Sequence, residues 1–120
     1  MKTREYKCTI FNKNGTKRPV EWINTNKLLR RPGFIGIKTG ITVTAGPCLA
    51  SAYEFRDKVY IVVVLRCNKV SRRFKETRKL LSWSLGKMFS RDLTGEEGKM
   101  LKQLKRNNGD LDSDYSEDER

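Results

Sequence analysis

Histidine is absent from the 120 residues, and its absence narrows the chemistry that the chain can perform. Ser-His-Asp and Cys-His mechanisms are excluded, so any catalysis would need lysine or a carboxylate as its base. The three cysteines, Cys8, Cys48 and Cys67, lie too far apart in the sequence for a CxxC zinc knuckle. Because no histidine could complete a metal site, we expect no metal. We also expect no cofactor, and reduced thiols with a structural role.

Long hydrophobic runs are missing as well. No apolar run approaches the roughly 20 residues that a membrane-spanning helix needs, so we expect no membrane span. The amino terminus, MKTREYKC, lacks the apolar stretch of a secretory signal. An intracellular location is therefore the default expectation.

Positive charge, by contrast, is abundant and unevenly distributed. The sequence has 26 Lys and Arg against 14 Asp and Glu, a formal charge of +12. Residues 110–120, DLDSDYSEDER, hold six acids and one arginine, which leaves 25 basic and 8 acidic side chains, or +17, in residues 1–109. Such a body attracts polyanions such as nucleic acid, acidic protein surfaces or its own tail, although a solvated lysine-rich surface explains the composition equally. Ser113 and Ser116 of the tail resemble acidophilic kinase sites.

The length fits one domain. In the first part, Asn14-Gly15 is a strong hairpin signal and predicts a peripheral two-stranded hairpin. NTNKLL, residues 24–29, predicts a capped single helical turn that Pro32 and Gly33 end. Three strands with short connections then predict an antiparallel meander, at residues 34–43, 47–55 and 59–66.

An amphipathic helix is predicted at residues 71–89, with Ser71 as its N-cap. Its apolar stripe consists of Phe74, Leu81, Leu85 and Met88. The third strand, VYIVVVLR, is apolar on both faces, which is typical of a strand covered on both sides. One helix covers only one face of a three-stranded sheet, so a partner or a larger fold must cover the other. The expected fold class is α+β, an antiparallel sheet with an N-terminal hairpin, packed on a C-terminal helix.

GIKTGITVTAG, residues 36–46, places a cation, a hydroxyl and a glycine in a row. A phosphate-binding loop needs a glycine-rich run that ends in GK[ST] ahead of a helix, and this spacing differs. On a strand, Lys38 and Gly40 share one side and Thr39 takes the other. Gly40 would let a ligand backbone lie close, while Lys38 and Thr39 could bind a carboxylate. The motif alone leaves a chance occurrence open.

Several blocks together resemble, in order and spacing, the C-terminal part of the catalytic domain of serine-type D-alanyl-D-alanine carboxypeptidases. These are the low-molecular-mass penicillin-binding proteins of peptidase family S11. The blocks lie within about residues 6–89 and read NTNKLL, PGFIGIKTGITVTAGPCLASA, VYIVVVLRCN and RRFKETRKLLSW. KTG belongs, with SxxK and a Ser-containing triplet, to the signature of penicillin-binding proteins and β-lactamases. The resemblance implies a partial β-lactamase/DD-peptidase-like fold.

The resemblance also implies roles for four residues. Lys38 would be catalytic, because it would hold the hydrogen-bond network around the serine of an SxN triplet. Substrate binding would fall to Thr39, Gly40 and Ile41, with Thr39 on the terminal carboxylate and the Ile41 N–H in the oxyanion hole. The implied substrate is a D-Ala-terminated peptide, hydrolysed through an acyl-serine intermediate.

Other matches are structural or incomplete. Asn24 and Asn26 match an NxN-like stretch that we expect to be structural, and Ile35 replaces a frequent aspartate, with altered local packing as the expected result. The family's SxxK nucleophile lies well upstream of KTG, whereas only 37 residues precede Lys38 here. The SxxK at Ser84 to Lys87 follows KTG, which chance explains, and no SxN triplet occurs.

We therefore expect a fragment or truncated member of the family that is inactive alone. A complementary chain could restore the site, so whether the chain is an enzyme stays open. The alternative is a non-catalytic binding or assembly module whose basic surface binds nucleic acid or a protein complex. The predicted organisation has three parts: a partial DD-peptidase-like domain at 1–89 that carries the KTG strand, a basic extension at 90–106 with a short helix at 96–105, and an acidic disordered tail at 107–120.

Overall fold

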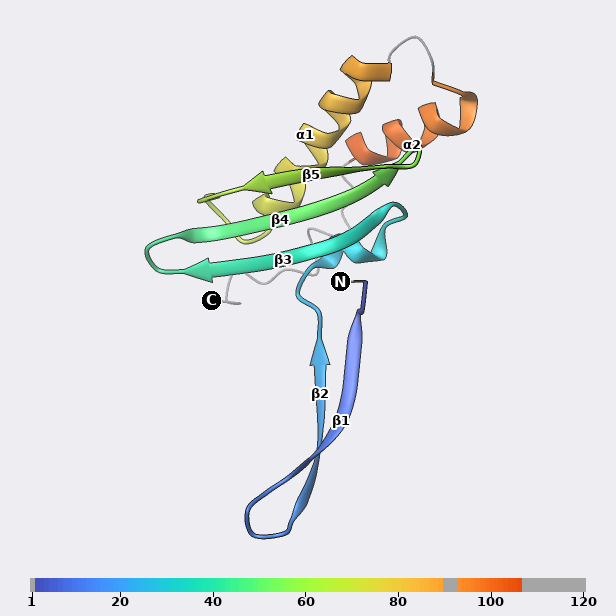
Figure 1. The fold of residues 1–120 in the computed structure, drawn as a ribbon. Helices are drawn as coiled ribbons and strands as arrows, with labels where there is room; N and C mark the ends of the chain where they lie inside the picture. Colours follow the sequence, from blue (N-terminus) through green and yellow to red (C-terminus); the bar gives the residue numbers. More distant parts are fainter. Residues whose placement is uncertain (1, 90–92, 107–120) are drawn as a thin grey trace.

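The chain folds into two antiparallel sheets and two α-helices (Figure 1), as a computed structural model of residues 2–89 and 93–106 shows. The elements are β1 Glu5–Phe11, β2 Lys17–Ile23, the 3-10 helix η1 Lys27–Arg30, β3 Phe34–Thr42, β4 Gly46–Phe55, β5 Lys58–Val64, α1 Arg72–Phe89 and α2 Gly95–Lys105. The first two strands form one sheet and the other three form a meander in the order β3-β4-β5. The predicted α+β class, with its hairpin and meander, is confirmed.

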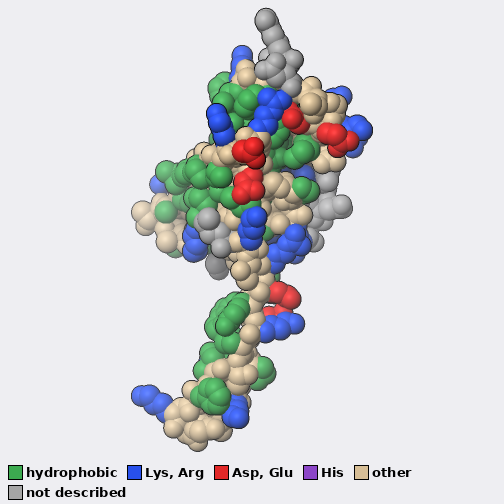
Figure 2. Space-filling model, turned by 45° about the vertical axis from the view of Figure 1, so that its right-hand side comes forward, with side chains coloured by type: hydrophobic (Ala, Val, Ile, Leu, Met, Phe, Trp, Pro, Cys, Tyr) green, Lys and Arg blue, Asp and Glu red, His purple; other side chains and the backbone are tan. Residues whose placement is uncertain are grey.

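The β1–β2 hairpin projects from the body as an arm (Figure 1). Its turn contains Gly15 at φ +83°, the left-handed backbone that the Asn-Gly signal predicts. Across the strands the rings of Tyr6 and Trp22 stack at 6.1 Å between centroids. Hydrophobic side chains are visible on the surface of both the arm and the body (Figure 2). The predicted peripheral hairpin is therefore confirmed.

The meander is held by tight turns. Arg56 and Asp57 connect β4 to β5 with φ values of +50° and +60°. The predicted end of the third strand at residue 66 is wrong, because β5 ends at Val64. Arg66 adopts φ +50°, which ends the extended backbone and turns the chain toward α1.

Helix α1 packs on β4 and β5 and closes the core. Phe74, Leu81 and Leu85 are almost completely buried, as the apolar stripe predicts. Met88 does not belong to this stripe, because its side chain is 55% exposed. The stripe continues through Phe89 instead, whose ring lies 5.4 Å from that of Phe55.

Helix α2 lies against α1, and its N-cap is Thr94, whose hydroxyl accepts from the Glu97 N–H. The predicted helix at 96–105 is therefore confirmed. Two arginines bind carbonyls at the other end of α2, which carries the negative pole of the helix dipole. Arg31 Nη1 donates to Gln103 O at 3.4 Å, and Arg78 Nη1 donates to Arg106 O at 2.9 Å. The predicted acidic tail, residues 107–120, lies outside the described residues.

The sheet face opposite α1 is uncovered within residues 2–89 and 93–106. Alternate side chains of β5 and the residue after it, here called the β5 row, are 51–72% exposed: Val59, Ile61, Val63 and Leu65. The strand register places Val63, Ala50 and Lys38 opposite one another on neighbouring strands, so they share this face. The sequence analysis predicted that one apolar face of the third strand is not covered by the helix. This face is exposed in the structure, and Lys38 lies on the same side of the sheet.

Candidate functional site

The Lys-Thr-Gly triplet lies on β3, an edge strand of the meander. Lys38 is exposed, and its ammonium donates to the carbonyl oxygen of Thr39. This contact holds the cation beside the strand rather than out in solvent. A cation in that position can neutralise an anion that lies along the edge of β3.

Thr39 points to the other side of the strand, as the alternation of side chains predicts. Only 7% of its surface is exposed, and its hydroxyl is hydrogen-bonded to the hydroxyl of Thr25. Thr25 lies in the segment between β2 and η1, 14 residues away in sequence. β3 is thus tied to this segment through the threonine of the motif itself.

Gly40 and Ile41 complete the predicted site residues. Gly40 is exposed, and a Cβ at this position would meet nothing within 4 Å, so a ligand has open space there. The backbone groups of alternate strand residues point to the same edge, so the Ile41 N–H shares an edge with the Thr39 carbonyl. The half-buried Ile41 side chain lines the next feature, a pocket at the end of the strand.

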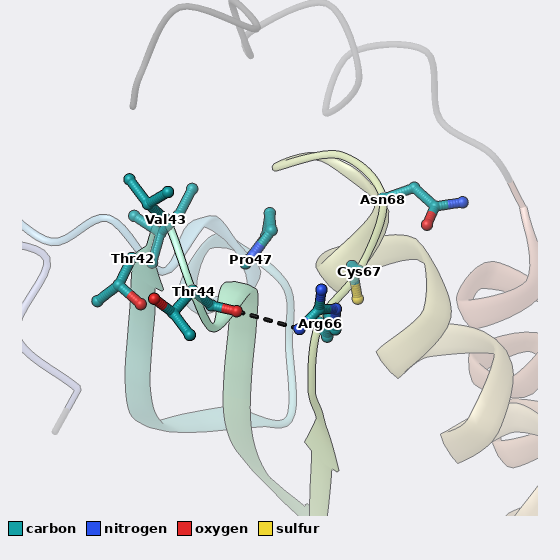
Figure 3. A pocket seen from close by; sticks show the side chains of 9 residues that line it. Thr42, Val43, Thr44, Pro47, Arg66, Cys67 and Asn68 are labelled. Carbon is teal, nitrogen blue, oxygen red and sulfur yellow. Dashed lines mark hydrogen bonds between the residues drawn. The ribbon is translucent and has the colours of Figure 1, made fainter.

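The pocket has a volume of about 700 Å³ and lies between the β3–β4 turn and the segment that follows β5 (Figure 3). Arg66 extends across it, and its Nη1 donates to Thr44 O at 3.1 Å. Cys67 and Asn68 lie beside it on the same segment. The pocket is therefore lined both by a cation, Arg66, and by Ile41, the residue that follows the motif.

Asn24 and Asn26 have the structural role that the sequence predicted. Asn24 Oδ1 accepts from the Asn26 N–H at 2.9 Å, and its amide donates to Thr3 O at 3.0 Å. Asn26 Oδ1 caps η1 by accepting from the Leu28 N–H at 3.2 Å. These bonds fix the turn that presents Thr25 to Thr39.

The SxxK sequence on α1 lies on the wrong side of the sheet for this site. Helix α1 covers the buried face of β4 and β5, whereas Lys38 lies on the opposite face. Ser84 Oγ is 3.9 Å from Met88 Sδ, and Lys87 is exposed. The geometry agrees with a chance occurrence of the motif.

Cys67 lines the pocket beside the site, but it is not an activated nucleophile. Burial raises the pKa of the Cys67 thiol, the charges of Glu76 and Cys48 raise it further, and Arg73 acts in the opposite direction. A raised pKa keeps the thiol protonated at neutral pH, and the protonated form is a poor nucleophile.

Alkylation by iodoacetamide should therefore be slower at Cys67 in the folded chain than in the urea-unfolded chain. Mass spectrometry of the Cys67 peptide gives both rates. The ratio of the two rates should approach one as the pH rises above the pKa values of both states, because both thiols are then ionised. A ratio independent of pH would mean that restricted access, not the pKa, slows the reaction.

The arrangement of sheet and helix, with Lys-Thr-Gly on the edge strand, is that of part of a DD-peptidase domain. The crystal structure of the Streptomyces K15 DD-transpeptidase matches with a TM-score of 0.65 and 32% identity, over 71% of this chain and 33% of that chain. A point mutant of the same enzyme matches with a TM-score of 0.64 over 34% of its chain. The α+β fold is thus that of DD-peptidases, with partial coverage.

A curated protein gives the same result at the level of sequence. The D-alanyl-D-alanine carboxypeptidase of Streptomyces sp. (strain K15) is 33% identical over 85 residues, which are 69% of this chain and 29% of that protein. The matched part of the chain is therefore homologous to this D-alanyl-D-alanine carboxypeptidase and spans less than a third of its length. No protein-family model matches the chain.

Two residues of the site were not predicted from the sequence. Arg66 was assigned to a strand, and only its left-handed backbone turns it into the pocket. Thr25 was part of a structural stretch, and no local signal indicates its contact with Thr39.

No helix among the described residues is long and apolar enough to cross a membrane.

Proposed function

We propose that the chain provides the substrate-binding strand of a DD-peptidase acyl-transfer site. The observation that carries this proposal is the position of Lys38-Thr39-Gly40: an edge strand whose lysine lies on the uncovered face of a sheet related to DD-peptidases. The ligand is a peptide that ends in D-alanine, and its terminal carboxylate lies along β3.

Each residue has a defined part in this proposal. The Lys38 ammonium attracts the carboxylate and organises the polar network of the site. The hydrogen bond between the Thr25 and Thr39 hydroxyls uses one of their two O–H groups. The other O–H group can donate to the carboxylate. The open space at Gly40 admits the peptide backbone, and the Ile41 N–H stabilises the oxyanion.

The nucleophile has to come from outside these 120 residues. We infer that the remainder of a DD-peptidase domain, with its SxxK helix, packs on the uncovered sheet face, where the β5 row offers four half-exposed apolar side chains. Covering the exposed half of such side chains stabilises a contact by roughly 1 kcal/mol each. The same contact would bring the nucleophile to the side of the sheet on which Lys38 lies.

Titration of the isotope-labelled 120-residue chain with acetyl-D-Ala-D-Ala tests the binding strand by NMR. Amide shifts should move at residues 38–41, and Lys38→Gln should weaken binding about tenfold, because hydrogen bonds to charged groups contribute roughly 1.5–3 kcal/mol. Lys58→Gln, which removes an exposed lysine at the start of β5, serves as the matched control and should leave affinity unchanged.

The C-terminally amidated dipeptide provides the second control. It lacks the carboxylate and should bind at least about tenfold more weakly. Equal binding of both dipeptides, or shifts that avoid β3, would contradict the proposed role of the strand.

A further inference from the structure

A second site lies where the hairpin meets η1. A hollow of about 600 Å³ separates them. Three cationic side chains and one carboxylate line it: Arg4, Lys27, Arg30 and Glu5. We call these four residues with Asn24 and Asn26 the basic hollow. Its excess of positive charge favours an anionic ligand.

An unpartnered donor in the wall also indicates a ligand. Asn26 is 2% exposed, and its Nδ2 has no hydrogen-bond partner among the described residues. The orientation of the amide is fixed, because Oδ1 caps η1 by accepting from the Leu28 N–H. A buried N–H group without an acceptor is costly, so an oxygen acceptor at this position would stabilise the structure.

We infer that the basic hollow binds an acidic peptide, and that its occupant is the chain's own segment 110–120. This segment contains six acids and one arginine, the charge complement of the hollow. It offers carboxylates both to the cations and to the Asn26 amide. The inference goes beyond the proposed function and does not depend on it.

The end of α2 lies close to the hollow. Arg31 follows Arg30 directly and donates to Gln103 O near the end of α2. The three residues 107–109 that join Arg106 to the acidic segment reach about 10 Å at ~3.3 Å per residue. A ligand tethered this closely has an effective concentration on the order of millimolar, so a weak site is occupied.

Occupation of the hollow also affects the motif strand. Thr25 lies between the two asparagines of the hollow and is hydrogen-bonded to Thr39. A carboxylate on Asn26 therefore acts one residue from the contact that holds β3. Phosphorylation of Ser113 or Ser116 would add negative charge and strengthen the docking.

The test compares the full chain with a full-length variant whose six tail acids are changed to Asn or Gln. Amide NMR spectra should differ at Lys27, Arg30 and the Asn26 side chain, and 0.5 M NaCl should remove most of the difference. Adding the peptide DLDSDYSEDER to the neutralised variant should restore the shifts. Differences confined to residues 107–120 would overturn the inference.

A matched pair of variants in the same neutralised chain separates the site from general attraction. Lys27→Gln with Arg30→Gln should weaken binding of the peptide about tenfold, whereas Lys13→Gln with Lys87→Gln, which removes two exposed lysines elsewhere, should leave it within about twofold. Equal weakening by both pairs would show a diffuse polyanion surface instead of a site. Shifts in the full chain that vary with protein concentration would show binding between chains and contradict docking of the chain's own segment.

Discussion

Replacement of Gly33 by alanine is expected to destabilise the fold by about 2–5 kcal/mol. Gly33 has φ +91°, a left-handed conformation that costs an L-residue roughly 1–2 kcal/mol. Its new Cβ would also lie 2.4 Å from Cε2 of Tyr53. The Tyr53 ring is 2% exposed and packs edge-on against Phe34 at 4.9 Å, so it has little room to move.

Gly15→Ala is the matched control for this substitution. Gly15 has a similar φ of +83°, but a Cβ there would meet nothing within 4 Å. Only the backbone cost of about 1–2 kcal/mol is expected. Urea unfolding of both variants measures the difference, and equal losses of stability would contradict a specific clash with Tyr53.

The meander and the hairpin could be predicted from the sequence because their signals are local. Asn14-Gly15 specifies a turn, and the alternation of apolar residues gives each strand its faces. The end of the third strand could not be predicted in this way. Leu65 and Arg66 read as a continuation of VYIVVV, and only the backbone of Arg66 shows where the strand ends.

The buried arginines show a second limit of local patterns. Arg78 is 2% exposed, although an arginine on an amphipathic helix normally faces solvent. It is buried because α2 folds back on α1 and presents the Arg106 carbonyl to its guanidinium. No periodicity within α1 contains that information.

For the Lys-Thr-Gly strand, the faces of the side chains could be predicted from the sequence, but their contacts could not. Alternation alone separates Lys38 and Gly40 from Thr39, and the structure has this arrangement. The partner of Thr39 was not predictable, because Thr25 reaches it through the turn that Asn24 and Asn26 build. A triplet that binds ligand in the proposed function thus also anchors the strand, so Thr39 variants need a stability measurement beside any binding assay.

The second large expected effect concerns acylation by penicillin, which requires a nucleophile on the uncovered sheet face. The 120-residue chain alone should not be labelled by a fluorescent penicillin, because its SxxK lies across the sheet from Lys38. On the proposed function, a chimera in which residues 6–89 replace the corresponding third of the Streptomyces K15 DD-transpeptidase should be labelled. Lys38→Ala should abolish labelling of the chimera. Labelling of the isolated chain would contradict this expectation.

Val63→Glu in the chimera tests whether the β5 row is the contact that completes the site. A carboxylate buried there without a partner costs roughly 3–5 kcal/mol, so labelling should fall more than about a hundredfold. Phe11→Glu on the hairpin is the control, because Phe11 is 69% exposed and Val63 54% exposed in this chain. Neither substitution should alter the urea midpoint of the isolated chain, since each side chain already faces solvent. If Val63→Glu left labelling intact, the remainder of the domain would not pack on this face, and Lys38 would lie away from the nucleophile.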